Sequence, residues 1–332
     1  MDGGFEALQA QLPPAAHLPS MLLSEHTSSA AAAEWAAWRA KTASAEEQVL
    51  LVRGGACNLL VDAMRRQSGA ALVLEDCIGA LARFATCGPT ARVIVRDAGA
   101  VAEILRCMEA HASQPELLEA AVGALGALTS VADGADDAEE CLAAVARAMR
   151  AHPHRAALQL SGCALIGYAV AGRSDEGRSA AVRALGVPAI LCAMRAHPED
   201  SSLLEAGCAA LCSLAASASP PIVAAVAEAH VGAMILDMML QLDASAPIQR
   251  WGAVSLCFLA ANTARAARFA TAAATSGAAD APAAPQGVAH LAQRGVGAVV
   301  RALSASTDAR MVEYGCSALW GLAALDEAGR QV

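Results

Sequence analysis

Aromatic residues are scarce in this 332-residue chain. Phe, Trp and Tyr together make up 3% of the sequence, and alanine is the most frequent residue. Strands are enriched in Val, Ile, Thr and aromatic residues, whereas Ala, Leu, Arg, Glu and Met favour helices. A hydrophobic content of 56% is also well above that of a disordered chain. The composition therefore excludes a sheet protein and a disordered chain, and it predicts closely packed, Ala-rich helices.

Charge is sparse as well, at 17% of residues with a net charge of -9. Lys41 is the only lysine, and the arginines are scattered along the chain, so nucleic acid is not an expected partner.

The longest stretch without a charged residue, 206–227, contains Pro220 and Pro221, so no membrane span is expected. No basic residue precedes Arg39, which fits neither a secretory signal nor a transit peptide. We expect an intracellular protein, cytoplasmic in the first place, with the nucleus as an alternative.

Patterns that would indicate catalysis or metal binding are missing. The 11 cysteines form no CxxC pair and fall in apolar runs, which predicts reduced core residues. His152 and His154 lack a nearby carboxylate or thiol, and the acidic run at 133–140 lacks the alternating ligands of an EF-hand. Neither a phosphate-binding glycine motif nor a nucleophile elbow is present. We therefore expect no catalytic residue, no metal and no cofactor. An ionisable group with a perturbed pKa in a cleft would be the evidence that favours an enzyme instead.

The chain contains an internal repeat, which decides the fold. "CAMRAHPEDSSLLEAGCAALCSLAAS" from Cys192 and "RAMRAHPHRAALQLSGCALIGYAVAG" from Arg147 are two of six similar segments. Each segment has an aliphatic anchor in an "AL"-type pair, and the steps between anchors are 44, 41, 45, 45 and 63 residues. The long step contains an Ala/Gly/Pro-rich insertion at 271–288. The six anchors are Leu81, Leu125, Ile166, Leu211, Leu256 and Leu319.

Each segment is expected to form a helix, a turn and a second helix, preceded by a shorter helix. Gly55, Gly99, Gly186 and Gly295 precede the first long helix, where a sharp reversal favours a residue without Cβ. Two or three helices in roughly 40–47 residues are typical of armadillo and HEAT solenoids. With its three-segment plan, this glycine and the "GC-AL-x-LA" third helix, the chain resembles the armadillo family over about 45–332. We expect about six such repeats, and we expect 1–44 to be a degenerate first repeat or a cap.

The resemblance implies an all-α, right-handed superhelix whose third helices line a concave groove that binds protein partners. Residues at -6, -2 and +2 from each anchor lie on one side of a helix, and the resemblance implies that this side faces the groove. The six triplets are Glu75, Gly79 and Arg83; Glu119, Gly123 and Ala127; Leu160, Ala164 and Tyr168; Glu205, Ala209 and Ser213; Arg250, Val254 and Phe258; and Glu313, Ser317 and Gly321. We call these 18 positions the stripe.

The stripe departs from the pattern of nuclear-import and catenin-type members, which carry a backbone-binding Asn at +2. This chain has no Asn there, which disfavours an import adaptor for basic signals. Tyr168 and Phe258 remain as anchors for a helix or a folded surface. The Glu at -6 in four repeats has two interpretations: favourable placement in the first helical turn, about 0.3–1 kcal/mol each, or an acidic ladder that selects a basic partner.

Other recurrent residues are expected to fill the core. A methionine lies 17 residues before each of the first five anchors, at Met64, Met108, Met149, Met194 and Met239. Small cysteines are expected where helices approach closely, at Cys77, Cys163, Cys208 and Cys316. Taken together, these patterns predict a non-enzymatic scaffold that binds a protein partner. The alternative is a structural subunit of a large assembly, or the solenoid arm of a larger signalling protein.

Overall fold

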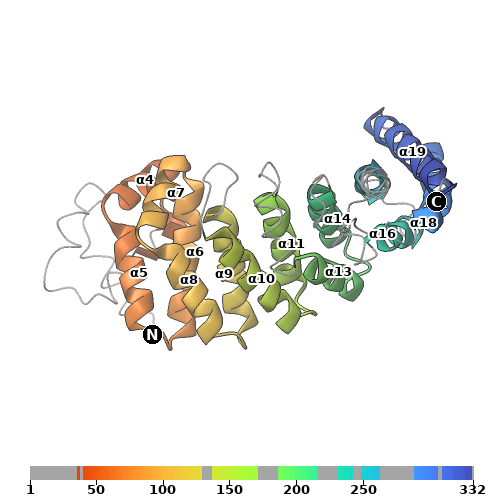
Figure 1. Ribbon diagram of the computed structural model, residues 1–332. Coiled ribbons are helices and arrows are strands. Elements are labelled where there is room, and N and C mark those ends of the chain that lie inside the picture. Colours follow the sequence, from red (N-terminus) through yellow and green to blue (C-terminus); the bar gives the residue numbers. More distant parts are fainter. Residues whose placement is uncertain are drawn as a thin grey trace, which may run out of the picture. The chain divides into compact units, whose positions relative to one another are not determined.

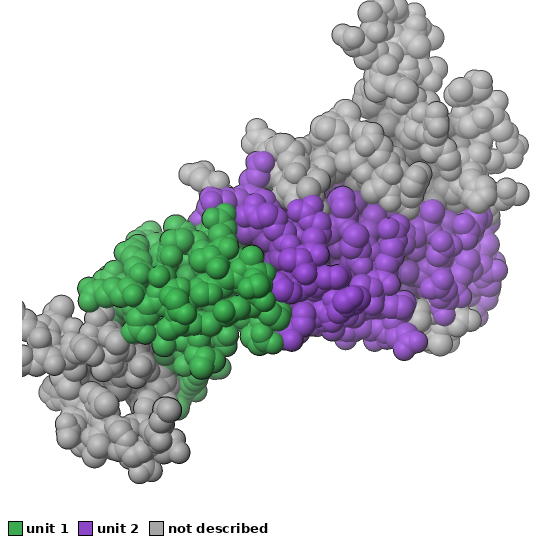
Figure 2. All heavy atoms as spheres, turned by 90° about the horizontal axis from the view of Figure 1, so that it is seen from below, with its two compact units in different colours: residues 1–129 green, residues 130–332 purple. Residues whose placement is uncertain are grey.

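The described part of the chain is helical throughout. The computed structural model describes residues 36–37, 40–128, 137–170, 186–215, 231–241, 248–261, 288–305 and 309–330, and no strand occurs among them. These residues belong to two compact units, 1–129 and 130–332, which are coloured separately in Figure 2. The Ala-rich composition thus gives the expected all-α fold. Most of the predicted N-terminal cap and all but the last residue of the 271–288 insertion lie outside the described residues.

The first unit contains two repeats of three helices each (Figure 1). Repeat 1 comprises α4 (Ala45–Arg53), α5 (Ala56–Arg66) and α6 (Ala71–Thr86). Repeat 2 comprises α7 (Pro89–Asp97), α8 (Ala100–Ala110) and α9 (Pro115–Leu128). Helix α4 packs on α7, α5 on α8 and α6 on α9, so corresponding helices of successive repeats lie side by side.

The sequence sets the helix boundaries of these repeats locally. Ser44 caps α4 in a capping box, because its hydroxyl accepts from the Glu47 N–H while the Glu47 carboxylate accepts from the Ser44 N–H. Gly55 and Gly99 precede α5 and α8 with φ of 87° and 84°. This left-handed conformation favours glycine, and it confirms the sharp reversal predicted at these two positions.

The second unit continues the same plan. Its helices are α10 (Ala138–Ala151) and α11 (Ala156–Val170) in repeat 3, and α13 (Gly186–Ala196) and α14 (Ser201–Ala215) in repeat 4. Repeat 5 contains α16 (Val231–Gln241) and the helical residues 248–261, and repeat 6 contains α18 (Val288–Ala305) and α19 (Ala309–Arg330). Helix α10 packs on α13, α11 on α14 and α16 on α18. Each unit is therefore a stack of repeats, as in an all-α solenoid.

The core lies between neighbouring helices and contains the anchors. Five of the six are fully buried, with 0% of the side chain exposed, and all five recurrent methionines are buried with them. The prediction that these positions fill the core is confirmed. Leu319 is the exception: it is half-buried, and Ala318 and Leu322 are the fully buried residues beside it.

Repeat 6 differs from the prediction at two glycines. Gly295 lies inside α18 instead of before it, because α18 already begins at Val288. A Cβ on Gly295 would stand 2.9 Å from Cδ1 of Leu322, so the close contact between α18 and α19 requires a glycine here. Gly321, predicted to face the groove, is buried, and its Cβ position lies 3.1 Å from Cβ of Ala260. Both differences come from the close packing of α19 on its neighbours.

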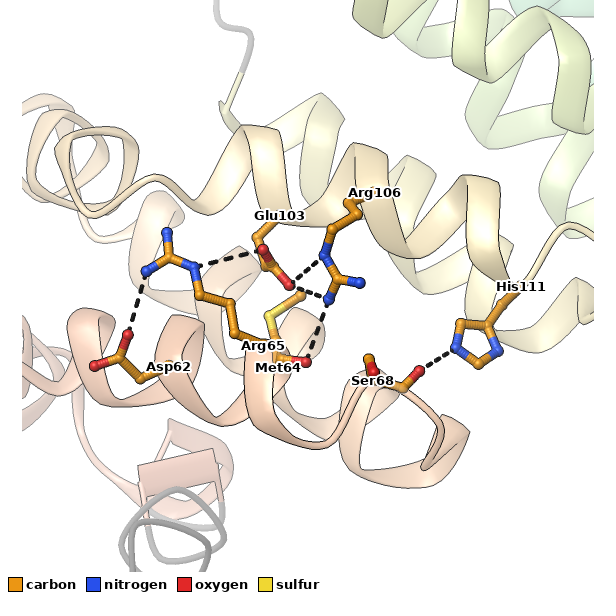
Figure 3. A network of polar contacts seen from close by, with 7 residues as sticks. All are labelled: Asp62, Met64, Arg65, Ser68, Glu103, Arg106 and His111. Carbon is orange, nitrogen blue, oxygen red and sulfur yellow. Dashed lines mark hydrogen bonds and ion pairs between the residues drawn. The ribbon is translucent and has the colours of Figure 1, made fainter.

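A buried carboxylate joins repeats 1 and 2 (Figure 3). Glu103 of α8 is 5% exposed and accepts from Arg106 Nε at 2.9 Å and from Arg106 Nη2. Arg65 of α5 approaches the other oxygen, with Nε 3.6 Å from Oε2. Arg106 Nη2 also donates to the Met64 carbonyl at 3.4 Å, and the hydrogen bond to Glu103 raises the pKa of Arg106. The carboxylate is thus held by one arginine from each repeat.

Histidines form a second recurrent junction between repeats. His111 Nε2 lies 2.6 Å from the Ser68 carbonyl oxygen, and His197 Nε2 lies 2.8 Å from that of Pro153. In both cases the histidine directly follows a helix, α8 or α13. It contacts the turn between the two long helices of the preceding repeat, α5 and α6 or α10 and α11. A ring N–H that donates to this carbonyl satisfies a backbone acceptor near the end of a helix.

Candidate partner-binding surface

The stripe is accessible along the third helices of repeats 1 to 5. Of its 15 positions there, Val254 alone is buried, and the others are half-buried or exposed. The anchors on the same helices are fully buried, so each helix has one packed side and one accessible side. In repeat 6, Glu313 and Ser317 are exposed and Gly321 is buried. The predicted pattern therefore ends one position early in repeat 6.

In the first unit, the stripe is charged and otherwise small. Glu75 is half-buried and Arg83 is exposed on α6, while Glu119 is half-buried on the neighbouring helix α9. Gly79 lies between Glu75 and Arg83, and Gly123 follows Glu119 on the same side of α9; nothing lies within 4 Å of a Cβ placed on either glycine. This part of the stripe is open.

In the second unit, two aromatic side chains project from the stripe. Tyr168 on α11 is 67% exposed and Phe258 is 38% exposed. Helix α14 lies between them: it packs on α11, and Ser255 Oγ of the 248–261 helix donates to the Cys208 carbonyl of α14 at 3.3 Å. Packed helices are about 8–10 Å apart, so two such steps separate the aromatic residues by roughly 20 Å.

Small side chains occupy the interval between Tyr168 and Phe258. Ala209 and Ser213 of α14 are half-buried. The Ser213 hydroxyl donates to the Ala209 carbonyl at 3.0 Å, so its polarity is largely satisfied within the helix. The surface between the two aromatic residues therefore carries small, weakly polar side chains.

One acidic position of the stripe is neutralised by the next repeat. Glu205 Oε1 accepts from Trp251 Nε1 at 3.0 Å and lies 3.6 Å from Arg250 Nη2. The Arg250 guanidinium also lies 5.9 Å from the centre of the Trp251 ring. The structure thus brings together the predicted residues Glu205 and Arg250 and adds Trp251. Sequence reasoning missed this tryptophan because it stands one position outside the stripe.

The four recurrent glutamates are not in the first helical turn. Glu75, Glu119, Glu205 and Glu313 are each the fifth residue of α6, α9, α14 and α19, respectively. The effect of the helix dipole falls off within the first turn. The first-turn interpretation is therefore wrong as stated, because each glutamate lies just beyond the first turn of its helix.

The recurrent cysteines differ in burial. Cys77, Cys163 and Cys208 are buried as predicted, and burial raises the pKa of Cys163 and of Cys208 to about 12. Such thiols are protonated at neutral pH and unreactive. Cys316 is exposed, so its predicted core role is wrong. It lies on a side of α19 that no helix covers in the part of the chain that the structure describes.

Among the residues that the structure describes, no group of three or more His, Cys, Asp or Glu side chains is arranged to hold a metal ion. His152 is half-buried and His154 is exposed; the acidic residues at 133 and 136 fall outside the described ranges. No helix in those ranges has the length and apolar character needed to cross a bilayer.

The three-helix repeats and left-handed glycines of the first unit, together with the stacked third helices of both units, define an armadillo-like repeat fold. No family model matches the chain, and no curated protein matches its sequence. Solved structures share the fold at low sequence identity. A designed armadillo repeat protein matches with a TM-score of 0.55 and 15% identity over 80% of this chain and 99% of its own.

Two further structures are similar in the same way. An engineered protein matches with a TM-score of 0.61 and 20% identity, over 81% of this chain and 97% of that one. A chain from a structure concerning a phosphorylation switch in the interaction between cadherin and beta-catenin matches with a TM-score of 0.63 and 14% identity. That match covers 98% of this chain and 73% of the other. Identities this low establish the fold and leave the partner to be argued from the surface.

Proposed function

We propose that the chain is a non-enzymatic scaffold that binds a protein partner through the stripe. The observation that carries this proposal is the exposure of Tyr168 and Phe258 on an otherwise aromatic-poor chain. Exposed aromatic side chains near small neighbours are typical binding anchors, because they bury a large area at little entropic cost. The similar structure that concerns cadherin and beta-catenin supports a protein partner by analogy only.

The chemistry of the stripe favours an apolar helix or a folded surface as the ligand. No Asn stands at +2 to bind an extended backbone, and Ser213 uses its hydroxyl within α14. Glu205 is already paired with Arg250, so the centre of the second unit offers little net charge. A helix of about 14 residues is roughly 20 Å long, which matches the interval between the two aromatic anchors.

The test is capture of partners from native lysate with the intact chain and with the double variant Tyr168→Ala/Phe258→Ala. Specific partners are expected to be lost from the double variant. Leu72→Ala is the matched control, because Leu72 on α6 is a large apolar residue that is also mostly exposed but lies outside the stripe. Equal capture by wild type and the double variant would contradict the proposal.

The acidic ladder is tested on the same captured partner. Changing Glu75, Glu119, Glu205 and Glu313 together to Gln should lower affinity and flatten its salt dependence if the partner is basic. The single variant Glu205→Gln should have the smallest effect on salt dependence, because Arg250 already compensates this charge. An affinity that is unchanged in the fourfold variant would restrict binding to the aromatic anchors.

A subunit role in a larger assembly is the second candidate, and the exposed apolar side chains of α18 and α19 favour it. A subunit whose surfaces are permanently buried is expected to precipitate or to form particles of indefinite size when isolated. A scaffold that binds its partner reversibly is expected to form only a monomer or a small oligomer of defined mass. Light scattering coupled to size-exclusion chromatography separates these outcomes.

A further inference from the structure

Repeat 6 presents an exposed apolar face. Val296 and Val300 of α18 project from one side of that helix, and Val312, Cys316 and Trp320 project from α19. The last three are spaced i, i+4 and i+8, which places them on one side of α19. Trp320 is 77% exposed. We call these five residues the end face.

Equivalent positions are buried in the inner repeats. Relative to the recurrent methionine, for which Leu303 stands in repeat 6, Val296 and Val300 correspond to Leu142 and Ala146 of α10. Both of these residues are buried, and α10 packs on α13 of the next repeat. The positions of Val312 and Cys316 are likewise buried in α11 and α14, at Gln159, Cys163, Leu204 and Cys208. The end face is therefore the repeat-stacking surface, here without a neighbour among the described residues.

Trp320 shows that this face does not suit another repeat at the spacing of the array. The equivalent position is small in all five other repeats: Ala82, Gly126, Gly167, Cys212 and Cys257. The reason is visible at Gly167, where a Cβ would stand 3.2 Å from Cα of Ala210 on α14. An indole at this place would collide with a helix stacked so closely, so the occupant of the end face must lie farther from α19.

We propose that the end face binds the end face of a second copy of this chain. In a two-fold pair each Trp320 can lie beside the partner's valines at a wider helix spacing, because the same patch serves both copies. The edges are compatible with such pairing, since α18 carries the exposed Arg301 and α19 carries the exposed Glu313. Antiparallel packing of α18 on the partner's α19 would bring these opposite charges together twice. Apart from Glu313, which belongs to both surfaces, this inference does not rest on the proposed function of the stripe.

The size of the face fits a weak dimer. The side chains that the structure describes span 294–304 of α18 and 311–323 of α19. At about 1.5 Å per residue and about 10 Å of width per helix, these stretches present roughly 360 Å². Two such faces together bury about 700 Å², less than the roughly 1,200 Å² of stable interfaces. We therefore expect a dimer that dissociates on dilution through the micromolar range.

The first test is sedimentation velocity of the intact chain from about 1 to 100 μM, with the variants Trp320→Ala and Leu72→Ala. Wild type and Leu72→Ala should dimerise alike, whereas Trp320→Ala should dissociate at a concentration at least about 10-fold higher, as for a central aromatic residue of an interface. Leu72→Ala is the matched control because Leu72 is a large apolar residue that is 77% exposed, as Trp320 is, and lies outside both the end face and the stripe. A wild-type chain that stays monomeric at 100 μM, or dimerisation unaffected by Trp320→Ala, would overturn the proposal.

A second measurement locates the interface. Cys192 and Cys316 are the two exposed cysteines of the chain. A short bis-maleimide should cross-link two copies of the wild-type chain and of Cys192→Ser, and it should fail with Cys316→Ser. Cross-linking that persists in Cys316→Ser would place the contact elsewhere. The result does not depend on any ligand of the stripe, so failure here leaves the proposed function unaffected.

Discussion

Met149 and Gly162 share one space in repeat 3. A Cβ on Gly162 of α11 would stand 2.5 Å from Sδ of Met149 on α10, well inside contact distance. The same relationship joins Gly207 to Met194 and Gly252 to Met239, and in repeat 6 Leu303 takes the place of the methionine beside Gly315. In these repeats, a large side chain on α10, α13, α16 or α18 thus occupies the space left by a glycine on the helix that follows it.

Gly162→Ala should therefore lower stability, although alanine favours helices. We expect a loss of about 1–2 kcal/mol, because overpacking of a buried site exceeds the gain of about 0.5–1 kcal/mol in helix propensity. Gly297→Ala is the control: Gly297 lies inside α18, is exposed and has nothing within 4 Å of its Cβ position. It should raise stability by about 0.5–1 kcal/mol. Denaturant unfolding measures both changes, and equal stabilisation by the two would contradict the packing described here.

Arg106→Ala should destabilise the first unit more than Glu103→Gln does. Removing the arginine leaves the buried Glu103 carboxylate with only the longer contact to Arg65. Removing the carboxylate leaves two arginines that are about half exposed and can be hydrated. The cost of an incompletely paired buried charge suggests a loss of about 2–3 kcal/mol for Arg106→Ala and about 1 kcal/mol for Glu103→Gln.

The double variant Arg106→Ala/Glu103→Gln is the informative control for this network. It should be more stable than Arg106→Ala alone, because the buried charge is gone. Thermal or denaturant unfolding followed by circular dichroism gives the order of the three variants. If the two single variants are equally stable, the carboxylate is not the group whose pairing matters.

Stability should fall at alkaline pH because of the buried thiols. The pKa values of Cys163 and Cys208 are raised to about 12 in the folded chain, whereas an unfolded thiol ionises near 8.5. Both thiols are neutral in either state below about pH 8, so their burial is not penalised there. Above that pH the unfolded chain loses protons that the folded chain retains, and stability falls up to about pH 12.

Between pH 8 and pH 10 the loss is of the order of 1–2 kcal/mol for each of the two thiols. Unfolding midpoints measured across this range should therefore decline steeply in the wild type. Cys163→Ala/Cys208→Ala removes both groups and should show a shallower decline from a lower starting stability. Parallel declines in the two proteins would show that other groups dominate the alkaline response.

Much of the fold could be predicted because the repeat places similar residues in similar surroundings. Leu81, Leu125, Ile166, Leu211 and Leu256 are buried because each is covered by its own repeat and by neighbouring helices. The same logic fails at Leu319 and Cys316, since repeat 6 has no following helix over that side in the ranges that the structure describes. Repetition in a sequence indicates which positions are equivalent, but burial also depends on what packs next to them.

The sequence indicated which side of each third helix is exposed, but it did not indicate which charged residues of that side are paired. Tyr168 and Phe258 are exposed, as the spacing from their anchors indicates, because helical periodicity fixes the side on which a residue lies. The pairing of Glu205 with Trp251 depends on how far the next repeat is rotated, which a single sequence does not encode in any short motif. Trp320 carried a usable signal: it is the one large residue at a position where every other repeat is small.

Gln159 and Gln249 give individual repeats an internal clasp. The buried amide of Gln159 donates to the carbonyls of Met149 and His152, and that of Gln249 donates to the carbonyl of Met239. Each bond closes a hairpin on itself, whereas the histidine and Glu103 bridges belong to the joints between hairpins. The hairpins of repeats 3 and 5 are therefore tied internally as well as packed on their neighbours, so altered joints would change how rigidly successive repeats are coupled while these internal bonds remain.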